Sequence, residues 1–438
     1  MTHQLTLRRS KLLVAATLLA ATTVHAQNSG AFSCSAPPKS SAAKQLTAAM
    51  RYNDSNGALG FDLEASPSIT GDSCTSTKPF FISIAEPDGN YQITLVAGGP
   101  TASTLTVKAE SRRLMLFHES IPANGARTFT FNVNVRTQRI GTGPNALPVK
   151  LKTREIGALD WDNKLTLEFN GDNPSIRALA IKPIDVPTIY IAGDSTVVDQ
   201  DKEPWAAWGQ MLPAFFTSAV SFSNQAESGE TSKSFVGERR LEKIMSTIKP
   251  GDFLLIQFGH NDQKSGSGYV PAMSDFKDLM RSYIAQAKAK GATTILVTPM
   301  NRRNFDDTGH ITATLGDYPQ AMKELGAEKG VAVIDLNAMS KTLYETLGKE
   351  GTLHAFVHYP ANTFPDQKDE LKDDTHFNAY GAYELTECIV QSITDQSLPL
   401  AKFLRPNIKP FDPAKPDPVA TFNMPPSPFV STATPYGR

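Results

Sequence analysis

Three residues in this sequence carry the side chains that nucleophilic acyl transfer requires. Ser195 lies in a Gly-Asp-Ser turn directly after the apolar segment 188–192, and Asp373 and His376 lie three positions apart much later in the chain. A serine hydroxyl attacks an acyl carbon when an imidazole accepts its proton, and a carboxylate orients that imidazole. Asp374 is a neighbouring alternative, but the D-x-x-H spacing favours Asp373. These residue types together indicate hydrolysis of an ester.

Two further segments place polar groups after apolar stretches. Gly229 ends the segment 224–229, and Asn261 follows the predicted strand 253–258. In a parallel sheet the carboxyl ends of the strands meet at one edge, where α/β proteins present their reactive groups. We therefore expect Gly229 and Asn261 to lie near Ser195. A Gly-Asp-Ser tripeptide by itself is weak support for catalysis, since most such tripeptides are surface turns.

The region 27–186 has the pattern of β structure. Short alternating runs such as 80–84, 91–96 and 128–133 are separated by turn clusters, without helical patterns between them. This arrangement predicts an all-β sandwich or jelly-roll domain.

From 187 to 406 apolar strands alternate with helical stretches, which predicts a three-layer α/β/α domain with a parallel sheet. The clearest helix begins at Ser274 or Asp275 and stops at Gly291. Residues 407–438 are Pro-rich and predict an extended tail, either packed on the surface or disordered. The strands of the parallel sheet are expected at 188–192, 253–258, 293–298 and 331–336.

Residues 1–26 have the layout of a secretory signal peptide. Three basic residues precede an apolar run that is too short to span a bilayer, and small residues end the segment. Removing those three from the 43 basic residues leaves 40 against 44 acidic residues, a net charge of −4. That balance favours neither nucleic acid nor a membrane as a partner of the mature chain. We predict a protein secreted to the periplasm or the extracellular space.

The chain has three cysteines. Export permits a disulfide between Cys34 and Cys74, which both lie in the N-terminal region, although the sequence does not prove the pairing. Cys388 lies in an apolar helical pattern and is predicted to be a buried free thiol.

The four segments around Ser195, Gly229, Asn261 and His376 resemble, in order and spacing, the four blocks of the SGNH (GDSL-type) hydrolase superfamily, whose fold is flavodoxin-like. The resemblance covers residues from about 188 to 405. The sequences Gly-Asp-Ser-Thr-Val, Phe-Gly-His-Asn-Asp and Asp-Asp-Thr-His-Phe-Asn are most similar to the rhamnogalacturonan acetylesterase group, which removes acetyl groups from pectic polysaccharide. The preceding β region resembles, more loosely, a galactose-binding-like domain.

This resemblance implies a role for each motif residue. Ser195 would be the nucleophile, His376 the general base and then acid, and Asp373 the orienting carboxylate. The backbone N–H groups of Ser195 and Gly229 and the side-chain amide of Asn261 would form the oxyanion hole. The implied partner is an acetylated polysaccharide or oligosaccharide, and the chemistry needs no metal or other cofactor.

Several other residues each allow two interpretations. Arg302 and Arg303 follow the strand 293–298 and either bind a uronate carboxylate or lie on a solvated loop. His354 and His358 have the spacing of metal ligands on a helix, but nearby prolines favour a loop and a sugar-contacting or exposed role. Trp208 either packs in the core or flanks the acyl pocket.

Two residues beside the motif are expected to be structural. His260 is predicted to form hydrogen bonds beneath Asn261, and Asp194 is predicted to brace the turn of Ser195.

Two alternatives to a pectin acetylesterase remain open at this point. The same mechanism could act on acetyl-xylan, a lipid or a thioester. A protein of a different class, a non-catalytic carbohydrate-binding protein, would need none of the five motif residues.

Overall fold

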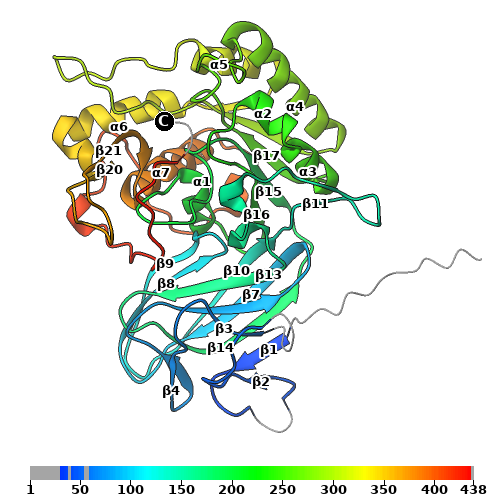
Figure 1. Ribbon diagram of the computed structural model, residues 1–438, viewed down its shortest axis with the longest axis vertical. Coiled ribbons are helices and arrows are strands. Elements are labelled where there is room, and N and C mark those ends of the chain that lie inside the picture. Colours follow the sequence, from blue (N-terminus) through cyan, green and yellow to red (C-terminus); the bar gives the residue numbers. More distant parts are fainter. Residues whose placement is uncertain (1–29, 38–40, 54–58, 436–438) are drawn as a thin grey trace, which may run out of the picture.

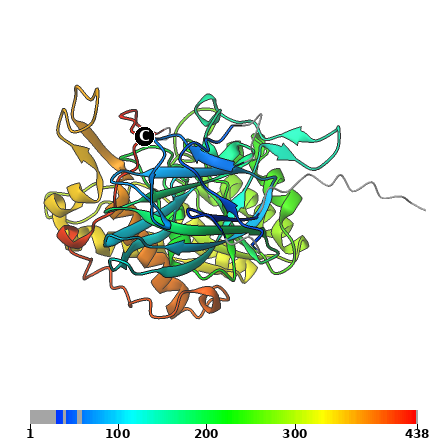
Figure 2. The same cartoon turned by 90° about the horizontal axis from the view of Figure 1, so that it is seen from below.

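The computed structural model describes residues 30–37, 41–53 and 59–435. The predicted signal peptide, residues 1–26, lies outside the described residues. A β domain occupies one end of the molecule and an α/β domain the other (Figure 1). Seen from below, the strands of the β domain lie across the α/β domain (Figure 2). No helix within the described ranges is long and apolar enough to cross a membrane.

The β domain is a sandwich of two sheets whose strands are mostly antiparallel. The first sheet has the order β10-β7-β14-β1-β2, with β5 and β4 beside β14, and the second has the order β3-β6-β13-β8-β9. The first sheet contains β1 (Gly30–Ser33), β2 (Lys44–Gln45), β4 (Ser68–Thr70), β5 (Ser73–Thr75), β7 (Gly89–Ala97), β10 (Arg127–Val135) and β14 (Ser175–Pro183). The second contains β3 (Leu59–Asp62), β6 (Phe80–Ala85), β8 (Ser103–Ala109), β9 (Arg113–Ile121) and β13 (Lys164–Asn170). A small hairpin of β11 (Arg139–Ile140) and β12 (Leu147–Pro148) lies apart from both sheets.

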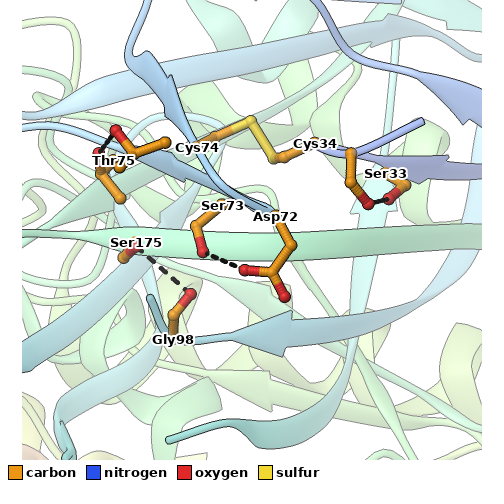
Figure 3. Close-up of a disulfide and its surroundings, with 10 residues drawn as sticks. Ser33, Cys34, Asp72, Ser73, Cys74, Thr75, Gly98 and Ser175 are labelled. Atoms are coloured by element: carbon orange, nitrogen blue, oxygen red, sulfur yellow. Dashed lines mark hydrogen bonds between the residues drawn. A yellow bond between two sulfur atoms is a disulfide. The ribbon is translucent and has the colours of Figure 1, made fainter. Parts of the chain in front are cut away.

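Side-chain alternation builds the core of this sandwich. In β7, Tyr91, Ile93 and Leu95 are buried, whereas the residues between them are partly exposed. The period of two points every second side chain to the same face, so one face of each sheet is apolar. Cys34 and Cys74 form a disulfide at the edge of this core, with their Cα atoms 5.5 Å apart (Figure 3).

The α/β domain contains a five-stranded parallel sheet of order β16-β15-β17-β18-β19. The predicted fold class is confirmed. All four predicted strands are present, the first with its predicted bounds and the other three slightly shorter. The strands are β15 (Thr188–Ala192), β16 (Ser221–Asn224), β17 (Phe253–Ile256), β18 (Thr293–Val297) and β19 (Ala332–Ile334).

Helices cover both faces of this sheet. In β15, Ile189 and Ile191 point into the apolar core that α1, α6 and α7 complete, whereas Tyr190 and Ala192 point into the core on the opposite face. The helices are α1 (Trp208–Met211), α2 (Ser232–Gly237), α3 (Arg240–Thr247), α4 (Lys277–Ala289), α5 (Tyr318–Lys329), α6 (Leu336–Gly351) and α7 (Ala379–Asp395). Short helical turns are η1 (Thr153–Glu155), η2 (Leu159–Trp161), η3 (Leu212–Phe215), η4 (Ala272–Phe276), η5 (Thr352–His354), η6 (Ala401–Phe403) and η7 (Val419–Thr421). Cys388 is a buried free thiol on α7, as predicted.

A strand, rather than a loop, precedes α7. Asp373 and His376 lie on strand β21 (Leu371–Phe377), which pairs antiparallel with β20 (Phe356–Tyr359). Phe356 and Phe377 are fully buried and pack against each other with their rings tilted by 48° and the ring centroids 4.8 Å apart. This apolar anchor at the base of the hairpin holds the strand in place.

The C-terminal tail packs across both domains. Lys108 of β8 donates a hydrogen bond to the carbonyl of Pro425 at 2.9 Å. Farther along, the backbone N–H of Glu203 donates to the carbonyl of Phe429 at 2.8 Å. The indole N–H of Trp205 donates to the carbonyl of Ser431 at 2.8 Å. The tail therefore links the β domain to the segment that follows Ser195.

Candidate active site

Ser195, His376 and Asp373 form a continuous chain of hydrogen bonds. Ser195 Oγ lies 2.9 Å from His376 Nε2, and His376 Nδ1 lies 2.9 Å from Asp373 Oδ2. Ser195 follows β15 at the carboxyl edge of the parallel sheet, and the other two residues come from β21, 181 positions away from Ser195 in the case of His376. All three side chains are buried, with at most 2% exposed. The arrangement joins a hydroxyl, an imidazole and a carboxylate in the order that proton transfer from serine requires.

The carboxylate of Asp373 is held in one orientation. Its Oδ1 accepts hydrogen bonds from the backbone N–H groups of Thr375 at 2.8 Å and His376 at 2.9 Å, which leaves Oδ2 for the imidazole. Burial alone would raise the pKa of Asp373, but the hydrogen bonds from His376 and these two N–H groups lower it below the ordinary value. Asp373 is therefore ionised and can stabilise a protonated imidazole.

The turn that carries Ser195 is tightly packed. A Cβ atom at Gly193 would lie 2.6 Å from Val197 Cγ2 and 2.9 Å from the carbonyl oxygen of Gln257, so this position admits only glycine. Asp194 Oδ1 accepts hydrogen bonds from the N–H and the hydroxyl of Thr196 at 2.9 and 2.8 Å, which confirms the predicted bracing role. Gln257, directly after β17, donates to the Thr196 hydroxyl at 2.7 Å. The neighbouring strand thus fixes the turn.

Two more predicted residues lie on adjoining loops. Gly229 has a φ of +80°, a conformation that favours glycine. Asn261 Nδ2 donates one hydrogen bond to the carbonyl of Glu230 at 3.0 Å, and a side-chain amide has a second N–H to donate. Among the described residues, no acceptor is recorded for the backbone N–H of Ser195 or of Gly229. Within the described residues, each of these groups therefore keeps an N–H that could serve an acceptor.

His260 lies beneath this site and is completely buried. Its Nε2 donates to the carbonyl of Met300 at 3.1 Å, and its Nδ1 lies 3.6 Å from Asp194 Oδ2. Burial lowers the pKa of His260, although Asp194 opposes that shift. The predicted structural role is confirmed, since this imidazole is neutral and engaged by the scaffold.

The two arginines after β18 differ in their surroundings. Arg302 is partly buried, and its guanidinium donates to the carbonyl of His260 at 3.1 Å. Burial lowers the pKa of Arg302, although the charges of Asp194 and Asp373 act in the opposite direction. Arg303 instead donates to Asp374 Oδ1 at 3.1 Å and to the Thr352 hydroxyl at 3.0 Å.

His354 and His358 do not lie on a common helix that could present both imidazoles to a metal ion. His354 is exposed in η5, and His358 lies on β20, so the expectation of a loop around His358 is wrong. His358 Nε2 lies 2.8 Å from Asp374 Oδ1, on the outer side of the hairpin from the buried Asp373.

The reading of Trp208 as a substrate contact is also wrong. Trp208 is fully buried in the core, and its indole N–H donates to Gln257 Oε1 at 2.9 Å. Trp205 packs against the imidazole of His376 instead, with ring centroids 5.9 Å apart and perpendicular planes.

The β domain also contributes contacts to this site, which the motif residues did not reveal. Gln200 Nε2 donates to the carbonyl of Ser195 at 2.9 Å, and the Gln200 carbonyl accepts from Arg112 at 3.1 Å. Lys152, beside η1, donates to the carbonyl of Ser228 at 2.7 Å and pairs with Glu230. The loops on both sides of the nucleophile are therefore held from the β domain. Apart from an Arg-Arg pair between two strand patterns, the sequence carries no signal for these contacts.

The comparisons with known proteins agree with this geometry. The model of the GDSL-like lipase/acylhydrolase family matches residues 191–383, which include all five motif residues. The chain belongs to this family and is an ester hydrolase.

Two relatives are described by a more specific activity than the family as a whole. A rhamnogalacturonan acetylesterase, RhgT, of Bacillus subtilis (strain 168) is 43% identical over 225 residues, 51% of this chain and 95% of that protein. A probable rhamnogalacturonan acetylesterase, YesY, of the same organism is 34% identical over 217 residues, 49% of this chain and 95% of that protein. The crystal structure of a Bacillus subtilis protein, YxiM, covers 84% of this chain and 99% of its own, with 24% identity and a TM-score of 0.44.

Proposed function

We propose that this protein is a secreted carbohydrate acetylesterase, with acetylated rhamnogalacturonan as its leading substrate. The observation that carries the proposal is the hydrogen-bonded chain from Ser195 through His376 to Asp373, with 2.9 Å at each step. The 43% identity with a rhamnogalacturonan acetylesterase supports the substrate class.

Acylation begins at Ser195 Oγ. His376 Nε2 takes the hydroxyl proton as Oγ attacks the acetyl carbonyl, and Asp373 stabilises the imidazolium that forms. The imidazolium then gives its proton to the leaving sugar oxygen, and the C–O bond to the sugar breaks. An acetyl group remains on Ser195 Oγ. His376 next takes a proton from the water that attacks the acetyl carbon. It then returns a proton to Ser195 Oγ as the bond between Oγ and the acetyl carbon breaks and acetate leaves.

The tetrahedral intermediate carries a negative charge on the former carbonyl oxygen. In this proposal the N–H groups of Ser195 and Gly229 and the free N–H of the Asn261 amide donate to it. Loss of one fixed donor of this kind typically raises the barrier by ~3–4 kcal/mol.

The proposed substrate carries uronate carboxylates, and we propose that Arg302 binds one of them. It lies on the loop after β18, and its pKa responds to Asp194 and Asp373, both close to the nucleophile. A guanidinium binds carboxylates through charge-assisted hydrogen bonds. Arg303 is already engaged by Asp374 and Thr352, so we expect a smaller contribution from it.

One feature of the structure supports the proposed export of the protein. The disulfide between Cys34 and Cys74 is typical of proteins in oxidising compartments. Residues 1–26 would then be removed as a signal peptide. N-terminal sequencing of the protein recovered outside the cytoplasm tests this part, since a start before residue 27 contradicts it.

The test of the activity is acetate release from a panel of acetylated polysaccharides. We expect rhamnogalacturonan to exceed acetyl-xylan, and short acyl chains to exceed fatty chains on one chromogenic leaving group. Ser195→Ala abolishes release while the protein stays folded. Ser246→Ala is the matched control, because Ser246 is exposed on α3 and leaves activity unchanged. Full activity in Ser195→Ala would remove the mechanism, and a preference for fatty chains would remove the substrate.

A further inference from the structure

Three carboxylates gather where the C-terminal tail crosses α7. Glu384 and Glu387 lie one turn apart on the helix, and Asp417 comes from the tail. One carboxylate oxygen of each lies within 4.8 Å of the other two. The Asp417 N–H donates to Glu384 Oε2 at 3.3 Å, and the Tyr380 hydroxyl donates to the Asp417 carbonyl at 2.7 Å. The fold thus holds three acids together despite their like charges.

Two oxygens of this cluster are enclosed and unpartnered. Glu384 is completely buried, and neither its Oε1 nor Oε2 of Glu387 has a hydrogen-bond partner among the described residues. Buried polar atoms are almost always satisfied, so these two atoms point to a missing ligand. Burial and, to a smaller extent, the neighbouring carboxylates raise the pKa of Glu384 and of Glu387 to about 8. The charge of Lys409 opposes this rise in pKa at Glu387 but not at Glu384.

Oxygen ligands of this kind suit a hard divalent cation. Ca²⁺ binds oxygens at about 2.3–2.6 Å, so two ligands of one ion lie at most about 4.6–5.2 Å apart. The separations within the cluster meet that limit. The group contains neither cysteine nor histidine, the ligands that favour zinc. We propose that Glu384, Glu387 and Asp417 bind a calcium-class divalent cation that fastens the tail to α7.

The test is thermal unfolding of the full chain, first stripped with a chelator and then titrated with CaCl₂. We expect a saturable rise in the unfolding midpoint and binding heat in calorimetry. The double variant Glu384→Gln/Glu387→Gln keeps the side-chain shapes, stays folded and loses both responses. Asp412→Asn is the matched control, because Asp412 is a half-exposed acid of the same tail, and it keeps them. A wild-type protein without response, or a double variant with the full response, would overturn the proposal.

A separate set of contacts concerns the turn Glu110–Arg112 between β8 and β9. Arg112 is buried, and its Nη1 donates to the carbonyls of Gln200 at 3.1 Å and Trp205 at 2.8 Å. Its Nη2 lies 2.5 Å from Glu203 Oε1. Glu110 and Arg112 have φ values of +55° and +64°, which residues other than glycine rarely adopt. The contacts across the domain boundary hold the turn in this conformation.

Both residues whose carbonyls accept hydrogen bonds from Arg112 contact a proposed catalytic residue. Gln200 donates to the carbonyl of Ser195, and the ring of Trp205 packs against the imidazole of His376. We infer that Arg112 is a positioning residue that fixes the nucleophile and the base relative to each other. This inference rests on the proposed function. It makes the β domain a part of the catalytic unit.

The test compares two adjacent arginines of similar burial. Arg112→Met should lower kcat on a chromogenic acetyl ester ~10- to 100-fold with KM unchanged, because small misplacements of reacting groups have effects of that size. Arg112→Lys restores part of the loss. Arg113 binds Asp199 and Asp160 rather than the two carbonyls, so Arg113→Met lowers the unfolding midpoint and leaves kcat within about twofold.

An unchanged kcat in Arg112→Met, or an equal loss of kcat in Arg112→Met and Arg113→Met, would overturn the inference. An active Ser195→Ala variant would instead overturn the proposed function, so the two failures are distinguishable.

Discussion

Replacing Asp373 or Asp374 with asparagine distinguishes two neighbouring acids, because we expect a large loss of kcat at Asp373 and a small one at Asp374. The two backbone N–H groups hold one carboxylate oxygen, and the imidazole Nδ1 holds the other. In Asp373→Asn the remaining oxygen stays with the N–H groups, so the NH₂ group faces Nδ1. Nδ1 must then accept, and the ring proton moves to Nε2, which faces Ser195 Oγ. A nitrogen that already carries a proton does not accept one from serine.

The expected loss is large. The same substitution in a Ser-His-Asp site reduces kcat ~10⁴-fold, about 5.4 kcal/mol of barrier at 1.36 kcal/mol per tenfold change. Initial rates on a chromogenic acetyl ester measure it, and thermal unfolding shows that the variant is folded.

Asp374→Asn is the matched control. The Asp374 side chain is 52% exposed and pairs with Arg303 and His358 outside the site. Exposed ion pairs contribute about 0–1 kcal/mol, so its kcat should fall less than about fivefold. A loss in Asp374→Asn equal to or larger than that in Asp373→Asn would refute the reasoning.

Three further changes concern stability. Cys34→Ala/Cys74→Ala should lower the unfolding free energy by about 4 kcal/mol, because the disulfide closes a 40-residue separation; a loss below about 1 kcal/mol in denaturant unfolding would contradict this. Trp208→Ala should lower it by ~3–5 kcal/mol, against less than ~1 kcal/mol for the half-exposed Tyr269→Ala. Glu384 and Glu387 have a folded-state pKa of about 8 against an ordinary 4.5, with Asp417, Lys409, Cys388, Tyr380 and Tyr383 facing them. The folded state therefore binds these protons more tightly, and the stability of the chelated protein should fall as pH rises through about 8. Unfolding midpoints of the chelated protein at about pH 5 and about pH 9 test this prediction. If the midpoint of Glu384→Gln fell as much between these pH values as that of the wild type, the prediction would be contradicted.

Local patterns were sufficient to predict the parallel sheet and the motif residues. Strand β15 is a short apolar run that ends in a tight turn, and α7 begins directly after Asn378, whose side chain caps the helix by accepting from the Gly381 N–H at 3.1 Å. Both signals lie within a few residues of the feature that they predict.

Other features depend on contacts between distant parts of the chain. Strand β21 contains Lys372, Asp373 and Asp374, a polar run that does not resemble a strand without its partner β20. Arg112 meets Trp205 93 positions later, and Ser431 reaches Trp205 from 226 positions away. No local spacing encodes such pairs, because they arise only when the two domains and the tail have packed.

A fluorophosphonate, which phosphonylates activated serines with loss of fluoride, tests most directly whether Ser195 and His376 act together. Peptide mass spectrometry after stoichiometric inactivation should find the adduct on Ser195 alone, and His376→Ala should react far more slowly. Labelling of another serine, or hydrolysis that continues unchanged once Ser195 is modified, would contradict the assignment.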